Sequence, residues 1–359
     1  MYIEVNMAIR VLNVMLGTGK GGLEASFVHY ARTFKEMGYV SSVLCHKKSP
    51  YIKELEKDEN ILIYKTTAGL FNPIVWWQFF KAIRSFKPDV LCLQGNRAIK
   101  FGTAKLLKKL IKPYPVTMAT THNARNKLFY KLDGMYAITK YLRNNLVNDF
   151  KIDERKVFEC SHAVSYPTKR YTYNVHAPLT FGFLGRLEPV KGGDVLLKAC
   201  LKLKEKHLPF RVLFAGDGAL FDEYKSFVSQ KELGENVEFL GWINDKDKFF
   251  EEVDVLCLPS RSEAQSLTLL EGLAYAKPSI VSACPGMVEV VSTKNSGLIF
   301  EIENADELAE KMTYLIENPD ECVILSDRAY QSFVEYYNID VQKKNLAYGI
   351  EETLRSKQK

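Results

Sequence analysis

Short apolar segments alternate with amphipathic helical patterns along this chain, and they form two consecutive sets. Apolar segments typical of strands occupy 9–16, 39–45, 89–94 and 116–122, then 179–185, 210–216, 237–241 and 253–259. Helical patterns lie between them at 23–37, 74–86, 98–112 and 140–150, then at 192–206, 219–231 and 266–276. Such alternation predicts parallel sheets with helices on both faces. We therefore expect an α/β fold of two doubly wound, Rossmann-like domains that face each other across a cleft.

The boundary between these domains is expected in the segment 165–178, which contains two prolines and has no apolar periodicity. This places the first domain at 1–168 and the second at 169–339. A last helix at about 340–359 is expected to pack back on the first domain.

Composition narrows the class of protein. The chain has 359 residues, 47% of them apolar, and no apolar run long enough to span a membrane. Its first residues are typical of a buried strand, not of a signal peptide. The seven cysteines are scattered without a CxxC pair, which favours reduced thiols and a cytoplasmic protein. Disulfide scaffolds, zinc ribbons, collagenous chains and integral membrane proteins are excluded.

Charge is divided unequally between the two halves. Up to Arg170 the chain has 28 Lys and Arg against 13 Asp and Glu, a balance of +15, and from Tyr171 onward the balance is −9. Such asymmetry suggests an anionic partner for the first half, either nucleic acid or an anionic membrane surface. A solvated basic face without a partner is the alternative.

A basic helix is expected at 98–112, with apolar residues on one side and lysines on the other. The lysines that would meet the acceptor or the membrane are Lys105, Lys108, Lys109 and Lys112. The preceding helix adds Trp76, Trp77, Phe79 and Phe80, residue types that favour membrane interfaces, although aromatic residues at this density are more often core. We expect peripheral binding to the inner face of the cytoplasmic membrane, and no nucleic acid.

Two loops of the first half follow predicted strands, where ligands bind in doubly wound folds. Gly17, Gly19 and Gly22 match a dinucleotide-binding pattern, but the acidic residue expected at the end of the next strand is missing, and the spacing of a Walker loop is absent. A loop that approaches a ligand closely and a simple tight turn both stay open. His122 ends a predicted strand and begins a polar cluster, which favours a position facing the cleft.

The loops of the second half carry a stronger signal. Arg186 and Lys191 lie on one loop before a helix, and cations beside a helix N-terminus bind anions. Two further glycines, Gly216 and Gly218, lie at the end of the predicted strand at 210–216. Glu263 and Glu271 follow another strand, and carboxylates accept hydrogen bonds from hydroxyl groups. Phosphate-binding and hydroxyl-binding groups together indicate a nucleotide sugar.

The second half also resembles a known family in four segments. They are GRLEPVKGGDVLLKA, AGDGALFDEY, VEFLGWIND and PSRSEAQSLTLLEGLAYAKPSIVSACPGMVEVV. These resemble the donor half of family 4 retaining glycosyltransferases, which have the GT-B fold. The spacing of Glu263 and Glu271 is similar to the paired-glutamate motif of that family. The likeness is greatest to transferases of lipopolysaccharide-core or surface-polysaccharide synthesis.

The resemblance implies an acceptor-binding first domain, a donor-binding second domain and a role for each matching residue. Arg186 and Lys191 would bind the donor diphosphate, Glu263 the sugar hydroxyls and Glu271 the ribose. His122 would contact the transferred sugar. The implied catalytic residues are His122, Arg186, Lys191 and Glu263. The implied donor-binding residues are Gly22, Gly185, Gly216, Gly218, Trp242, Gln265, Ser266, Leu267 and Glu271.

Residues 264–266 depart from the family pattern, because Ala-Gln-Ser stands where a Gly-aromatic-Gly run is usual. Gln265 is therefore expected to add a side-chain contact with the donor. Asp245 and Asp247 have the spacing of a metal-binding pair but lie in a polar loop and are interpreted as solvated. No metal and no cofactor are expected.

The implied reaction moves a hexosyl unit from a nucleotide diphosphate sugar, with UDP as the expected nucleotide, to a glycan or lipid-linked acceptor with retained configuration. Two other functions stay open. A sugar-nucleotide epimerase shares the architecture and the phosphate chemistry. A nucleic-acid-binding protein would explain the basic first half but would leave the paired glutamates without a role.

Overall fold

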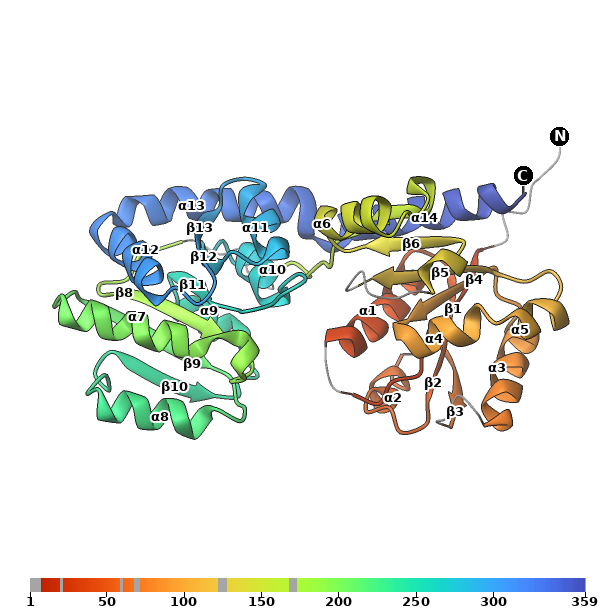
Figure 1. Ribbon diagram of the computed structural model, residues 1–359, viewed down its shortest axis with the longest axis horizontal. Coiled ribbons are helices and arrows are strands. Elements are labelled where there is room, and N and C mark those ends of the chain that lie inside the picture. Colours follow the sequence, from red (N-terminus) through yellow and green to blue (C-terminus); the bar gives the residue numbers. More distant parts are fainter. Residues whose placement is uncertain are drawn as a thin grey trace. The chain divides into compact units, whose positions relative to one another are not determined.

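The computed structural model describes residues 8–19, 22–58, 61–67, 72–121, 128–167 and 173–358. Contacts divide the chain into two compact units, shown in Figure 1: one contains Met1–Ser161 and Gln342–Lys359, the other His162–Val341. The first unit thus ends at Ser161, where the sequence suggested 168. Residues after Ser161 join the second unit because Val164 pairs with Asn338 there.

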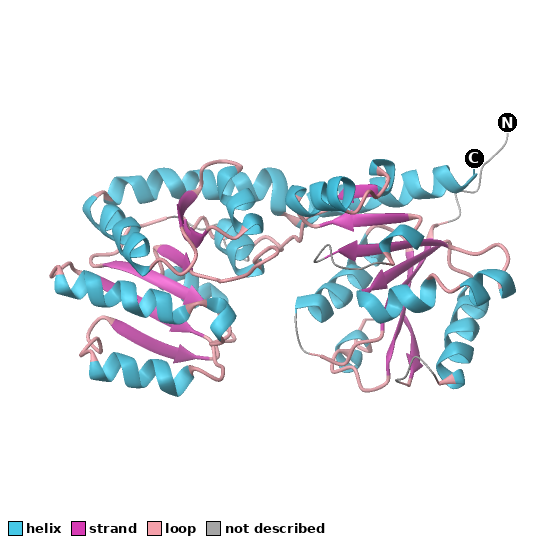
Figure 2. Ribbon diagram, viewed as in Figure 1, coloured by secondary structure: helices cyan, strands magenta, loops and turns pink. Residues whose placement is uncertain are grey.

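The first unit is built on a parallel sheet of seven strands in the order β3-β2-β1-β4-β5-β6-β7, drawn as magenta arrows in Figure 2. The strands are β1 Arg10–Met15, β2 Val40–His46, β3 Leu62–Thr66, β4 Val90–Gln94, β5 Val116–Thr121, β6 Gly134–Ala137 and β7 Val157–Glu159. The four strands expected here from the sequence are confirmed as β1, β2, β4 and β5. Their fully buried residues explain why their apolar runs are continuous.

Helices cover this sheet and include the end of the chain. They are α1 Gly22–Glu36, α2 Ile52–Leu55, α3 Pro73–Phe86, α4 Gly95–Gly102, α5 Lys105–Leu110, α6 Lys140–Asn144 and α14 Ile339–Gln358. Helix α14 packs tightly on β6. The Tyr136 hydroxyl donates to the Leu346 carbonyl at 2.6 Å, and a Cβ on Gly349 would lie 2.5 Å from the Tyr136 ring. Helix α14 thereby completes the core on this face of the sheet.

The single helix expected at 98–112 is wrong, because the segment forms two short helices, α4 and α5. The break falls at Thr103 and Ala104, where Ala104 is extended (φ −68°, ψ 129°). The Thr103 hydroxyl donates to the Ile99 carbonyl at 2.7 Å, a side-chain bond of the kind that competes with helix continuation. Lys112 lies beyond the end of α5, so the four lysines do not share one helix.

The second unit is built on six parallel strands in the order β10-β9-β8-β11-β12-β13. The strands are β8 Leu179–Leu184, β9 Phe210–Ala215, β10 Val237–Gly241, β11 Val255–Leu258, β12 Ser279–Ser282 and β13 Gly297–Phe300. The main helices are α7 Gly193–Glu205, α8 Phe221–Gln230, α9 Lys246–Glu252, α10 Leu267–Ala274, α11 Pro285–Ser292, α12 Ala305–Glu317 and α13 Pro319–Ser332. Two parallel sheets with helices confirm the expected α/β class.

Two further observations concern the cysteines and the helices. All seven cysteines are free and buried. Among the described residues, no helix is both long and apolar enough to cross a membrane.

Candidate functional site

Three loops meet at the carboxyl edge of the second sheet, where strands β8, β9 and β10 end. Backbone hydrogen bonds join them: the Gly185 N–H donates to the Ala215 carbonyl at 3.0 Å, and the Gly216 N–H donates to the Gly241 carbonyl at 2.7 Å. Gly216 has φ 142°, and a Cβ there would lie 1.8 Å from the Gly185 carbonyl oxygen. A Cβ on Gly218 would similarly meet Leu187 at 2.5 Å. These two glycines, expected at the donor, therefore hold the loops together.

Lys191 lies at the end of a short 3-10 turn, Pro189–Lys191, directly before α7. Gly192 closes the turn with φ 68°, and a Cβ there would lie 1.9 Å from the Pro259 carbonyl oxygen. The turn thus packs against the segment that follows β11. This packing brings the Lys191 ammonium into an ion pair with Glu263, although the two residues are far apart in sequence.

The other two charged residues expected at the donor also have partners. Arg186 pairs with Glu188 at 2.6 Å on the surface. Glu271 of α10 pairs with Lys246, the first residue of α9, at 2.6 Å. Each pair joins a cation suited to phosphate with a carboxylate suited to hydroxyl groups. This edge of the sheet therefore offers both kinds of group to a ligand that carries phosphates and hydroxyls.

Helix α10 begins beside the ion pair of Lys191 and Glu263. Ser266 is its N-cap and accepts from the Leu269 N–H at 3.3 Å, and Leu267 is its first residue. The Thr268 hydroxyl donates to the Leu184 carbonyl at 3.2 Å, which fixes the helix against the end of β8. The first-turn N–H groups of a helix and its dipole favour an anion. The N-terminus of α10 is thus a suitable place for a phosphate.

Two residues expected at the donor lie in very different surroundings. Gln265 is only 6% exposed, and its side-chain oxygen accepts from the His162 N–H at 2.8 Å. Its carbonyl group is therefore engaged inside the protein and fixes the loop before α10 to the start of the second unit. Trp242 follows β10 and is 70% exposed.

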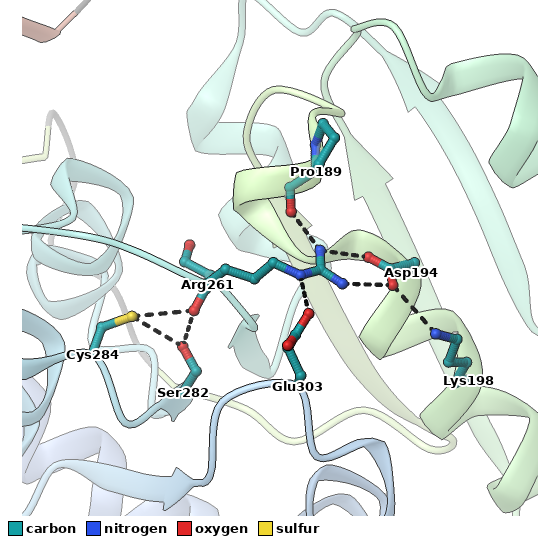
Figure 3. Close-up of polar contacts among 8 residues, drawn as sticks. Pro189, Asp194, Lys198, Arg261, Ser282, Cys284 and Glu303 are labelled. Atoms are coloured by element: carbon teal, nitrogen blue, oxygen red, sulfur yellow. Dashed lines mark hydrogen bonds and ion pairs between the residues drawn. The ribbon is translucent and has the colours of Figure 1, made fainter.

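The sequence reasoning missed Arg261, which lies at the centre of the cluster in Figure 3. Its guanidinium group bonds both oxygens of Asp194 at 2.9 Å and Glu303 at 2.5 Å, and also donates to the Pro189 carbonyl. Its backbone N–H donates to the Val190 carbonyl at 2.8 Å. Arg261 therefore holds the turn that carries Lys191. The sequence offered one signal for this role, because Arg261 lies only two residues before Glu263, a candidate site residue.

Charge within this cluster shifts the pKa of its members. Burial raises the pKa of Asp194, but the hydrogen bonds and charge of Arg261 outweigh this effect, and the net pKa is lowered. Hydrogen bonds to Asp194 and Glu303 raise the pKa of Arg261. Asp194 is therefore ionised at neutral pH, and the cluster keeps its charges.

The interpretation of Asp245 and Asp247 as solvated holds for Asp245, which is exposed, but not for Asp247, which is partly buried. Asp245 caps α9 by accepting from the Lys248 N–H at 3.1 Å, and Asp247 accepts from the Tyr275 hydroxyl. Burial and this bond to Asp247 raise the pKa of Tyr275. In the part of the chain that the structure describes, no group of three His, Cys, Asp or Glu side chains could hold a metal ion.

Two predicted positions belong to the first unit. His122 lies outside the described residues, so its role stays a prediction. Gly22 is the first residue of α1, and the positions just before it lie outside the described residues. Lys105, Lys109 and Lys112 are exposed, and Lys108 is partly buried.

A family model described as "Glycosyl transferases group 1" matches residues 172–332. The chain carries a group 1 glycosyl transferase domain. The match covers most of the second unit, which holds Arg186, Lys191, Glu263 and Glu271. The two-sheet architecture is the GT-B fold, so both the family and the fold implied by the sequence resemblance are confirmed.

Two curated relatives and one solved structure illustrate the similarity of this chain to known proteins. It is 30% identical over 235 residues to an uncharacterized glycosyltransferase of Methanocaldococcus jannaschii; this covers 64% of the chain and 59% of the relative's length. It is 24% identical to an uncharacterized glycosyltransferase of Haemophilus influenzae, over 86% of the chain and 90% of the relative. The crystal structure of Anabaena HepE with UDP superposes with a TM-score of 0.80 at 14% identity, covering 96% of this chain and all of HepE. HepE was also solved with UDP-glucose.

Proposed function

We propose that this protein is a retaining hexosyltransferase. It moves a hexosyl unit from a UDP-sugar to a hydroxyl group of a glycan or glycolipid in lipopolysaccharide or surface-polysaccharide synthesis. One observation carries the proposal: in a domain matched by the glycosyltransferase family, Lys191 and Glu263 form an ion pair next to the N-terminus of α10. The second unit binds the donor, and the first unit binds the acceptor.

The chemistry follows from the charges at this edge of the sheet. When the bond between the anomeric carbon and the diphosphate oxygen breaks, negative charge develops on the diphosphate. Lys191, Arg186 and the first N–H groups of α10 stabilise that charge, because they are positioned before the reaction begins. The acceptor oxygen bonds to the anomeric carbon, and its proton passes to the departing diphosphate. Glu263 accepts from sugar hydroxyls, and Glu271 accepts from the ribose.

UDP is the expected nucleotide because a protein of the same fold, HepE, was crystallised with UDP and with UDP-glucose. A thermal-shift screen of UDP-, GDP- and ADP-sugars tests this choice. A ligand at 100 times its Kd stabilises the folded state by about 2.7 kcal/mol, which raises Tm measurably. A shift with GDP- or ADP-sugars and none with UDP-sugars would contradict the assignment of the base.

The reaction is tested by incubating the protein with UDP-glucose and with extracted glycolipid or glycan acceptors, followed by NMR of the product. A new glycosidic bond with the donor's anomeric configuration is the expected result. Interconversion of nucleotide sugars without any acceptor would instead identify an epimerase. An inverted linkage would contradict the retaining mechanism.

Peripheral membrane binding belongs to the same proposal and is supported by side chains of the first unit. Ile74 and Trp77 on α3 and Leu106 and Leu110 on α5 are each more than half exposed. Lysines lie between and beside the two leucines of α5. Apolar side chains beside basic ones suit the interface of an anionic bilayer, where each base contributes about 1 kcal/mol. By contrast, the buried Phe79 ring stacks on Phe101, and the partly buried Trp76 ring contacts Phe101 at a tilted angle.

A further inference from the structure

A cavity of about 300 Å³ opens in the first unit at the carboxyl edge of three neighbouring strands, β1, β4 and β5. Its lining includes Met15 at the end of β1, Gln94 and Arg97 after β4, and Thr121 at the end of β5. Ile99 and Phe129 add apolar walls. This volume is at the lower end of the range for small-molecule sites, so the cavity suits one sugar or polyol unit.

Two lining side chains are almost completely buried and have an atom without a hydrogen-bond partner. Within the described residues, neither the Gln94 side-chain oxygen nor the Thr121 hydroxyl has a partner, and both residues are 1% exposed. The Gln94 amide nitrogen is engaged, because it donates to the Cys92 sulfur at 3.4 Å. Unpaired buried polar atoms cost free energy. Hydroxyl groups of a ligand would supply the missing donors.

The same cavity has a cationic side. Helix α4 begins at Gly95, which has φ 79°, and its first residues line the cavity. Arg97 lies on this first turn and is exposed, and no described carboxylate forms an ion pair with it. A guanidinium group beside the N-terminus of a helix favours a phosphate or carboxylate. Hydroxyl-accepting and anion-binding groups therefore lie in one small cavity.

We propose that this cavity binds an anionic sugar or polyol unit, with its hydroxyls on Gln94 and Thr121 and its phosphate or carboxylate on Arg97 and the start of α4. Phe129 and Ile99 pack against the C–H face of that unit. That the bound unit is the acceptor rests on the proposed function, whereas the binding itself does not. The substrate class is thus a phosphorylated or carboxylated glycan unit.

The test measures binding of three probes to the full chain by saturation-transfer NMR: glucose 6-phosphate, glucose and inorganic phosphate. Glucose 6-phosphate should bind about tenfold more tightly than either fragment, since one charge-assisted contact contributes about that factor. Arg97→Gln should remove this advantage over glucose. The control Lys100→Gln removes an exposed cation of the same helix that does not line the cavity, and should leave binding unchanged.

Thr121→Val separates ligand binding from folding. It replaces an unpaired hydroxyl with a methyl group of similar size, so Tm should not fall, while the affinities for glucose and glucose 6-phosphate should both fall. Equal affinity for all three probes, or equal effects of Arg97→Gln and Lys100→Gln, would overturn the proposal. Binding of UDP, measured in the same samples, reports separately on the donor site. Failure of the proposed function can therefore be distinguished from failure of the proposal about this cavity.

Discussion

Arg261→Gln tests whether the cluster of Figure 3 serves catalysis by fixing Lys191. The substitution removes the bonds to both oxygens of Asp194, to Glu303 and to the Pro189 carbonyl. These bonds are partly exposed, so we expect a loss of about 2 kcal/mol in the free energy of unfolding. The backbone bond to Val190 is kept, so the turn should shift without unfolding. A displacement of about 1 Å at a catalytic group lowers kcat roughly 100-fold.

Steady-state kinetics with a UDP-sugar and urea unfolding provide the two measurements. Arg211→Gln is the matched control, because Arg211 pairs with Glu238 at 2.7 Å and Glu252 at 3.3 Å on another part of the same unit. It should lower stability to a similar or smaller extent and leave kcat unchanged. Equal effects of the two substitutions on kcat would mean that Arg261 acts only through general stability.

A double variant gives the decisive comparison. If Arg261 acts through Lys191, then Arg261→Gln should have little further effect on kcat once Lys191→Ala is present. If the factors by which kcat falls in the two single variants multiply in the double variant, the reasoning is refuted. The folded state of the double variant can be checked by the cooperativity of its unfolding.

Three further predictions concern other groups. Glu271→Ala should weaken binding of free UDP by calorimetry, whereas Glu263→Ala should chiefly lower kcat; unchanged UDP affinity in Glu271→Ala would limit that residue to its ion pair with Lys246. Burial lowers the pKa of Lys277 from 10.5 to about 7. Between pH 7 and pH 10.5 the unfolded chain therefore binds more protons than the folded protein. The free energy of unfolding should thus rise by about 1 kcal/mol per pH unit in this range. Lys277→Met should abolish that rise in urea unfolding at pH 7 to 9; an unchanged slope would contradict it. Changing Lys105, Lys108, Lys109 and Lys112 to Gln should reduce co-sedimentation with phosphatidylglycerol vesicles at low salt; equal binding by both proteins, or tighter binding to duplex DNA, would exclude these lysines from membrane binding.

Strand periodicity was sufficient to predict the fold class, because the central strands of both sheets are buried on both faces and leave continuous apolar runs. The edge strand β3 was missed, since Leu62 is 54% exposed and the apolar signal there is weak. The prediction of a single helix at 98–112 was wrong for a local reason. Thr103 bonds back to Ile99, and this competition is invisible to a count of apolar spacing.

At the site, the sequence predicted which residues carry charge but not how they pair. The contact between Lys191 and Glu263 depends on the packing of Gly192 against Pro259, which joins segments from different strands. Gln265 was expected to contact the donor, yet its side-chain oxygen accepts a hydrogen bond from the His162 backbone N–H. Arg261 was overlooked because its importance comes from four groups that only the fold brings around it.

Because α14 packs on the first unit, it determines the order in which the two units can be completed during synthesis. In the order of the chain, β6 precedes the second unit, whereas α14, the helix that covers Tyr136, follows most of it. The second unit is one continuous segment, so all its residues are synthesised before the part of α14 that packs on the first unit, Gln342–Gln358. The first unit is therefore completed only after the second unit has been synthesised. Until then an apolar face around Tyr136 and Met118 stays uncovered and accessible to chaperones.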